Sequence, residues 1–173
     1  MLYEGGIRVP LLVKWPGHVK RGAVSDVPII GLDIYPTLAE IIGCNDAAQT
    51  DGVSLVPLLH GQAPASRSLY WHFPAYLQMY ERDQAFEDSH DKPHFRTSPA
   101  SAIRVGDWKL FEFFENGEVE LYNLTEDISE KNNLAQSHPS IRDSLHRQLK
   151  KWRDEVAAPV PQEMNPEYEP MAN

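Results

Sequence analysis

The most chemically suggestive residues lie in one short segment, 70–76, in which aromatic side chains surround His72. Aromatic rings stack on sugars and other flat ligands, and an imidazole beside them can donate or accept a hydrogen bond. The alternation is equally typical of a strand whose rings belong to the core and whose histidine faces solvent. The residues alone leave both interpretations open: a ligand pocket near His72 and Tyr76, or an ordinary core strand.

A metal site is the second chemistry that the sequence suggests. The chain has 7 histidines, and His90 and His94 lie beside Asp88 and Asp91 in a segment without periodicity. Imidazole and carboxylate groups are ligands of transition metals. No two histidines bracket a glutamate at the spacing i, i+4, however, so we expect these four to be solvated loop residues. Cys44 has no basic neighbour in the sequence, and we expect an incidental thiol.

Composition excludes several classes of function. The 173 residues include 16 Lys and Arg against 25 Asp and Glu, a formal charge of −9, whereas nucleic-acid binding needs a basic face. No apolar run reaches the roughly 18 residues that span a membrane, and no signal sequence opens the chain. A single cysteine excludes an internal disulfide framework. We expect an acidic globular protein with no nucleic-acid partner and no membrane span.

The first part of the chain has the pattern of an α/β layer. Residues 9–15 form a nearly continuous apolar run before Pro16-Gly17, which is typical of a strand buried on both faces. A helix is predicted over residues 33–43, with Asp33 as N-cap and Gly43 as its left-handed end. We expect this strand and the apolar face of this helix to lie uncovered in the isolated chain.

The second part has the pattern of an antiparallel sheet and a helix. Strands are predicted at 68–73, 101–105, 108–114 and 119–124, and the last three form a meander because short turns join them. Residues 77–100 are predicted to be a long loop. A helix begins near Pro139, and its apolar stripe (Ile141, Leu145, Leu149, Trp152 and Val156) can cover one face of the meander. We expect an extended tail from residue 159.

A resemblance to a known family rests on short motifs in a fixed order. They occupy residues 3–17 (beginning Tyr-Glu-Gly-Gly-Ile-Arg-Val-Pro), 33–38, 51–55, 70–74, 102–110, 120–124 and 130–134. Together they resemble the carboxyl-terminal portion of type I sulfatases, the arylsulfatase and N-acetylgalactosamine-6-sulfatase group of the alkaline-phosphatase superfamily. The implied fold is an α/β fragment: the end of the large N-terminal domain in residues 1–62, and in residues 63–173 a small antiparallel sheet packed on a C-terminal helix.

The resemblance also implies what this chain lacks. Such sulfatases cleave sulfate esters with a formylglycine made in a Cys/Ser-x-Pro-x-Arg motif, with bound calcium, and with a lysine that precedes the Tyr-Glu-Gly-Gly segment. The motif is absent here, and the other groups belong upstream of residue 1. We therefore expect no catalytic residue, metal ligand or cofactor in this chain and no activity from it alone. Formylglycine and calcium are expected in the intact family member.

The implied site residues are few. His72 and Tyr76 are expected at the rim of the substrate pocket. Glu4, Gly5 and Gly6 are expected to form a turn that supports the active site, in which glycines permit positive φ and close approach. The implied partners are a sulfated carbohydrate or aryl sulfate and the missing N-terminal catalytic domain, and the intact enzyme is expected to be periplasmic or secreted.

Two alternatives stay open. One is a stand-alone carbohydrate-binding or interaction module that uses the aromatic segment 70–76. The other is a phosphoesterase of the same superfamily. The apolar run 9–15 argues against an independent module, because such a module has no reason to keep a doubly buried strand.

Overall fold

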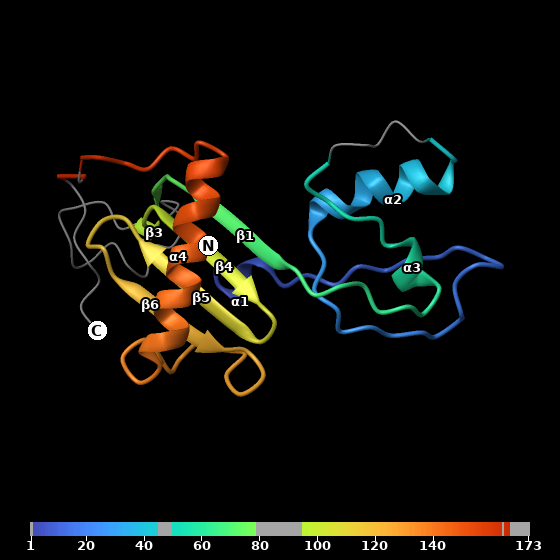
Figure 1. Cartoon of the computed structure of the whole chain (residues 1–173), viewed down its shortest axis with the longest axis horizontal. Helices are drawn as coiled ribbons and strands as arrows, with labels where there is room; N and C mark the ends of the chain where they lie inside the picture. The colour runs from blue at the N-terminus through green and yellow to red at the C-terminus, as the bar shows by residue number, and fades with distance from the viewer. Residues whose placement is uncertain (1, 45–49, 79–94, 164, 167–173) are drawn as a thin grey trace, which may run out of the picture. The chain divides into compact units, whose positions relative to one another are not determined.

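The computed structural model describes residues 2–44, 50–78, 95–163 and 165–166 (Figure 1). The chain divides into two compact units. The sheet unit comprises Met1–Val9 and Ser68–Asn173, and the helical unit comprises Pro10–Arg67. This division differs from the boundary predicted between residues 62 and 63, because the first nine residues pack with the C-terminal part of the chain. None of the described helices is long and apolar enough to cross a membrane.

The sheet unit is built on a four-stranded antiparallel sheet. Its strands are β1 (Ser68–Phe73), β4 (Ala100–Val105), β5 (Trp108–Phe113) and β6 (Val119–Asn123), in the spatial order β1-β4-β5-β6. The predicted meander is therefore confirmed, and β1 extends it as an edge strand paired with β4. Gly106, in the turn between β4 and β5, has a φ of +58°, which favours glycine.

A second, two-stranded sheet corrects the prediction of a continuous loop over residues 77–100. Leu77–Gln78 (β2) pairs with Phe95–Thr97 (β3) in antiparallel fashion. Strands of two and three residues are too short to produce a recognisable alternation in the sequence. Residues 79–94, including the possible metal ligands Asp88, His90, Asp91 and His94, lie outside the described part of the chain.

Helix α4 (Pro139–Glu155) lies across one face of the four-stranded sheet (Figure 1). The core between them contains Ile103, Leu110, Leu121, Leu145 and Leu149. The Trp152 ring stacks on Tyr70 of β1, with centroids 4.7 Å apart. The predicted apolar stripe is confirmed except at Val156, which ends the helix and is half exposed because the chain leaves the sheet there.

The helical unit contains a 3-10 turn η1 (Gly31–Asp33), helix α2 (Ile34–Ile41) and the short helix α3 (Val56–Leu59). Gly43 has a φ of +70° after α2, as predicted. The predicted strand over residues 9–15 is wrong. The described part of this unit offers no neighbouring strand to complete a ladder, and the segment is irregular, with Leu12 92% exposed.

The apolar face of α2 is uncovered in part, as expected. Ile34, Leu38 and Ile41 are 39%, 55% and 38% exposed. The buried residues of this helix are instead Pro36, Thr37 and Ala39. Hydrophobic burial within the described helical unit is therefore limited, whereas the sheet unit has a closed core.

The core under α4 predicts a large effect of one truncation. Leu149→Ala should lower the free energy of unfolding by about 2–5 kcal/mol, because the Leu149 side chain is completely buried and its loss leaves a cavity. Chemical denaturation measures this change. Lys151→Ala on the exposed side of the same helix is the control and should cost under about 0.5 kcal/mol. A loss below about 1 kcal/mol for Leu149→Ala would mean that α4 docks differently.

Candidate functional site

The centre of the sheet unit's other face is a buried lysine held by two carboxylates, the lysine cluster (Glu4, Lys109 and Glu130). Lys109 Nζ donates a hydrogen bond to Glu4 Oε1 at 2.8 Å and lies 2.9 Å from Glu130 Oε1. The Glu4 amide donates to Glu130 Oε2 at 2.5 Å. Lys109 is fully buried and Glu4 is 5% exposed. A buried ammonium needs such partners, because neither charge is stable alone in an apolar environment.

The sequence positions this cluster through strand alternation. Lys109 of β5 points to the face opposite Leu110, so it lies away from α4 and beside the aromatic rings of Trp71 and Phe111, 5.9 and 4.9 Å from their centroids. Glu130 comes from the turn region after β6, where its φ of +53° is unusual for a side chain other than glycine. The cluster therefore joins three segments that are distant in the sequence.

Glu4 reaches the cluster from α1 (Glu4–Ile7), a single helical turn at the start of the chain. Tyr3, just before it, packs its ring on Phe111 with centroids 4.6 Å apart and donates its hydroxyl to Glu120 at 2.6 Å. Burial, and then the bond to Glu120, raises the pKa of Tyr3 well above its usual range, so the phenol stays a neutral donor. Burial likewise raises the pKa of Glu120.

The expected glycine turn is partly wrong. Neither Gly5 nor Gly6 has a positive φ, because both lie within the right-handed turn of α1. A Cβ added at Gly5 would meet no atom within 4 Å among the described residues, so no close approach within this chain requires glycine there. Glu4 is the residue of the trio whose side chain is bound by another segment, while a supporting role for the turn stays a prediction.

The other predicted site residues lie where β1 ends. His72 Nδ1 is 2.7 Å from Ser101 Oγ, and His72 Nε2 is 2.8 Å from the Pro159 carbonyl oxygen. The Tyr76 hydroxyl donates to the Glu115 carboxylate. Both nitrogens of the imidazole therefore have partners within the chain. That these two residues contact a substrate stays a prediction.

A second, partly buried set of ion pairs anchors α4 and was missed by the sequence reasoning. Arg153 Nη2 lies 2.6 Å and His146 Nε2 lies 3.0 Å from Glu112 Oε2 on β5. Burial favours the protonated form of Glu112, but His146 and Arg153 outweigh it and lower the pKa below its usual value. Glu112 lies opposite Ser101 in the sheet, on the row that also contains His72. No pattern in the sequence indicates this pairing.

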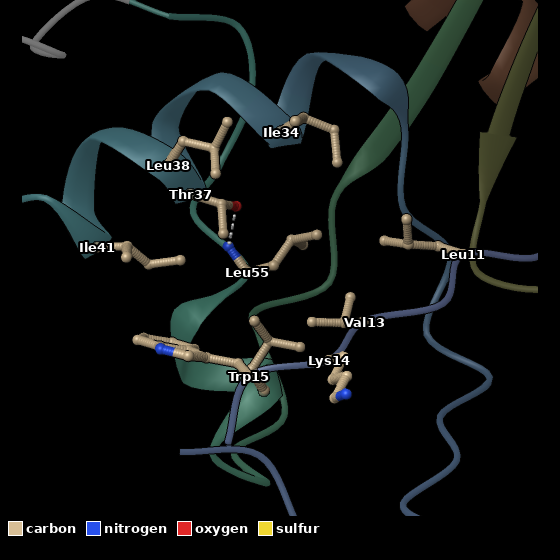
Figure 2. A pocket seen from close by; sticks show the side chains of 10 residues that line it. Leu11, Val13, Lys14, Trp15, Ile34, Thr37, Leu38, Ile41 and Leu55 are labelled. Carbon is tan, nitrogen blue, oxygen red and sulfur yellow. Dashed lines mark hydrogen bonds between the residues drawn. The ribbon is translucent and has the colours of Figure 1, made fainter. Parts of the chain in front are cut away.

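The helical unit contains an apolar groove of about 290 Å³ (Figure 2). Ile34, Leu38 and Ile41 of α2 form one wall, and Leu11, Val13 and Trp15 of the irregular segment form another. Lys14 is the one charged residue among those that line it. The two apolar segments predicted from the sequence therefore meet, although one of them is not a strand.

Asp33 organises the frame of this groove. Its Oδ1 accepts the Val53 amide at 3.0 Å, and its Oδ2 accepts the Ile30 amide at 2.9 Å and the Arg67 guanidinium. Asp33 is the N-cap residue of α2, as predicted, but its carboxylate makes no cap bond to this helix. Burial favours protonation, but these donors, Arg67 first, lower the pKa of Asp33 below its usual value.

Two of the sequence motifs meet at this frame. The Thr37 hydroxyl donates to the Asp33 carbonyl at 2.5 Å and accepts the Leu55 amide at 2.8 Å, the bond dashed in Figure 2. A Cβ at Gly52 would lie 2.0 Å from the Leu32 carbonyl oxygen, so only glycine fits. Segments 33–38 and 51–55 therefore have a structural role, in which side chains of the first accept backbone amides of the second.

Metal binding finds no support among the described residues, where no three His, Cys, Asp or Glu side chains converge on a site that could hold an ion. Cys44 is exposed and unbonded to another cysteine.

Comparison with solved structures defines the class of fold. A 2-O GAG sulfatase has 20% sequence identity and a TM-score of 0.58, over 78% of this chain and 27% of that one. A protein solved in complex with its substrate, D-glucosamine-2-N,6-O-disulfate, has 23% identity and a TM-score of 0.56, over 76% of this chain and 25% of that one. The matched residues of this chain therefore have a fold that occurs in solved sulfatases.

The family follows from the sequence. Residues 1–155 match the model described as N-sulphoglucosamine sulphohydrolase, C-terminal, and the chain belongs to this sulfatase family. It is 32% identical to a sulfatase of Formosa agariphila over 91% of this chain and 29% of that protein. It is 30% identical to arylsulfatase K of Danio rerio over 86% of this chain and 26% of the relative. The predicted resemblance is confirmed, and the chain spans less than a third of the length of these relatives.

The buried carboxylate of Asp33 predicts that the stability of the helical unit depends on pH. Because the folded-state pKa of Asp33 is lowered, its contribution to stability should be complete above the unfolded value of about 3.9 and should disappear as the pH falls through the folded value. At pH 7, Asp33→Asn should lower the free energy of unfolding by about 3 kcal/mol. The difference between the two proteins should shrink below about pH 4.

Urea unfolding from pH 7 to 3, followed through the NMR signals of α2, measures this dependence. Asp26→Asn, at an exposed aspartate of the same unit, is the matched control and should leave the profile unchanged. A stability difference for Asp33→Asn that does not vary with pH would contradict the assigned role of the carboxylate.

Proposed function

We propose that this chain is the C-terminal part of a sulfuric ester hydrolase that acts on a sulfated carbohydrate or an aryl sulfate. The match of residues 1–155 to the sulfatase family carries this proposal. A relative of Bacteroides thetaiotaomicron, 28% identical over 88% of this chain, is named N-acetylglucosamine-6-O-sulfatase, which supports a sulfated sugar as substrate. We further propose that the intact enzyme is periplasmic or secreted.

The chain does not hold a complete set of catalytic groups among its described residues. Attack on a sulfate ester needs an activated nucleophile and cations that stabilise the charge on the sulfate oxygens. Two buried basic side chains of the sheet unit are instead paired, Lys109 with two carboxylates and Arg153 with Glu112. We propose that the formylglycine and the residues that bind calcium lie in sequence outside this chain. The N-terminal catalytic domain that contains them would be the partner of this chain.

Activity assays on two proteins test the proposal. The 173-residue chain should show no turnover of an aryl sulfate with calcium present. The longer protein that carries it should hydrolyse the aryl sulfate, and replacement of its motif cysteine or serine by alanine should abolish this activity. Turnover by the short chain that survives repurification would contradict the assignment of the chemistry to the missing part. A longer protein that cleaves phosphate monoesters but no sulfate ester would contradict the substrate class.

We place His72 and Tyr76 at the rim of the substrate pocket. Their location at the end of an edge strand supports this proposal, because that strand leads into the segment that the family resemblance puts near the active site. A substrate hydroxyl would then replace the Pro159 carbonyl as the partner of His72 Nε2.

A substitution in the longer enzyme tests the rim. His72→Ala should raise KM for the natural sulfated sugar, with little change in kcat. The loss of binding free energy should be about 1–3 kcal/mol. The effect on a minimal aryl sulfate should be much smaller, because that substrate has no sugar hydroxyls. His138→Ala, at an exposed histidine, is the control. Equal losses on both substrates would place His72 in the catalytic centre or the fold, and no loss would make it a surface residue.

A further inference from the structure

We propose that Lys109 and Glu130 are positioning residues for sulfate ester hydrolysis. They fix the N-terminal turn, residues 3–7, against the sheet, and through it they fix the polypeptide that leads into the turn. This inference rests on the proposed function, because only a longer enzyme has catalytic groups for the turn to position.

Hydrogen bonds within the turn make it rigid, and Glu4 is the residue that attaches it to the sheet. Within it, the amides of Gly6 and Ile7 donate to the Tyr3 carbonyl at 2.8 and 3.2 Å, and the Arg8 amide donates to the Glu4 carbonyl at 2.9 Å. Both polar ends of Glu4 are held by the sheet unit: the carboxylate by Lys109 and the backbone amide by Glu130. A rigid turn held at two atoms of one residue has a defined position and direction.

The attachment of Glu4 to the sheet depends on a balance between buried charges. Glu4 and Glu130 are brought together by the ammonium between them, and Glu4 Oε2 has two weaker contacts, with Arg8 Nη1 at 3.6 Å and Arg104 Nη1 at 3.8 Å. Without the ammonium, two carboxylates with almost no access to water face each other. Like charges at such a site repel, so we expect the turn to move away from the sheet.

The lysine cluster is better explained by a role in positioning the N-terminal turn than by a contribution to the stability of the fold. The larger apolar core of this unit lies on the opposite face of the sheet, under α4, and a smaller one around Phe111 lies on the face of Lys109. Replacing buried ion pairs with apolar side chains of similar volume is often neutral or stabilising, and the best-attested use of such charges is to specify one arrangement. Lys109 among Trp71 and Phe111 occupies a place that methionine could fill.

Placement errors are costly in catalysis. A displacement of about 1 Å far from the chemistry can reduce a rate about a hundredfold, because reacting groups must be held at near-attack distances. Because the turn is rigid, a displacement of Glu4 also displaces the polypeptide that precedes it. We expect loss of the cluster to affect kcat rather than the affinity for substrate.

The test compares two variants of the longer enzyme that both affect a fully buried residue of the same unit. Lys109→Met removes the ammonium, whereas Leu149→Ala destabilises the α4 face without touching the turn. The kcat is divided by the folded fraction, which near-UV circular dichroism measures at the assay temperature. Lys109→Met should lower this corrected kcat at least tenfold with KM within twofold, and Leu149→Ala should leave it within twofold.

Amide exchange on the 173-residue chain provides an independent measurement. In Lys109→Met the amides of Gly6, Ile7 and Arg8 should exchange at least tenfold faster, while those of the β4–β5 ladder keep their protection. Glu130→Gln should produce the same pattern more weakly, because it leaves the ammonium paired with Glu4.

The outcomes separate this inference from the proposed function. If the unmodified longer enzyme hydrolyses sulfate esters and Lys109→Met has the same corrected kcat, the positioning role is wrong and the function stands. Unchanged exchange in the turn would also overturn it. If the longer enzyme has no sulfatase activity, the proposed function fails and the catalytic part of this inference fails with it, while the exchange data still decide whether the cluster holds the turn.

Discussion

A lysine that has no contact with water must be held by carboxylates, and this constraint organises the sheet unit. Lys109 lies on β5, and its partners come from the first helical turn and from the region after β6. Burying the ammonium therefore requires that the N-terminal turn and the segment after β6 meet at the same point of the sheet. The aromatic packing of Tyr3 on Phe111 and the bond from Tyr3 to Glu120 follow from that closure. The N-terminal turn belongs to the C-terminal sheet for this reason.

In the helical unit the buried charge that needs partners is a carboxylate instead of an ammonium. Asp33 is buried, and it is satisfied by two backbone amides and by Arg67. In both units, residues of the family motifs meet other motif residues, Glu4 with Lys109 and Asp33 with Val53. The charged motif residues Glu4, Lys109 and Asp33 thus have structural partners. The chain belongs to the sulfatase family, and we propose that it supports chemistry that lies in sequence outside it.

The sequence predicted those elements whose cause is local. Strands β4, β5 and β6 and helix α4 follow from alternation, turn residues and a 3.6-residue stripe. The strand over residues 9–15 was predicted wrongly because apolar character indicates burial, whereas a strand also needs a hydrogen-bonded neighbour. The lysine cluster could not be predicted, because nothing in the sequence links Lys109 to partners 105 residues before it and 21 after it. The resemblance marked these residues as belonging to motifs, but it did not show that they touch.

The most direct test of the account is a double-mutant cycle between Glu4 and Lys109, measured as the free energy of unfolding of the 173-residue chain. If the two charges stabilise each other in a buried site, Glu4→Gln and Lys109→Met together should cost about 1–3 kcal/mol less than the sum of the single substitutions. Additive effects, within about 0.5 kcal/mol, would contradict the claim that this pair holds the N-terminal turn on the sheet.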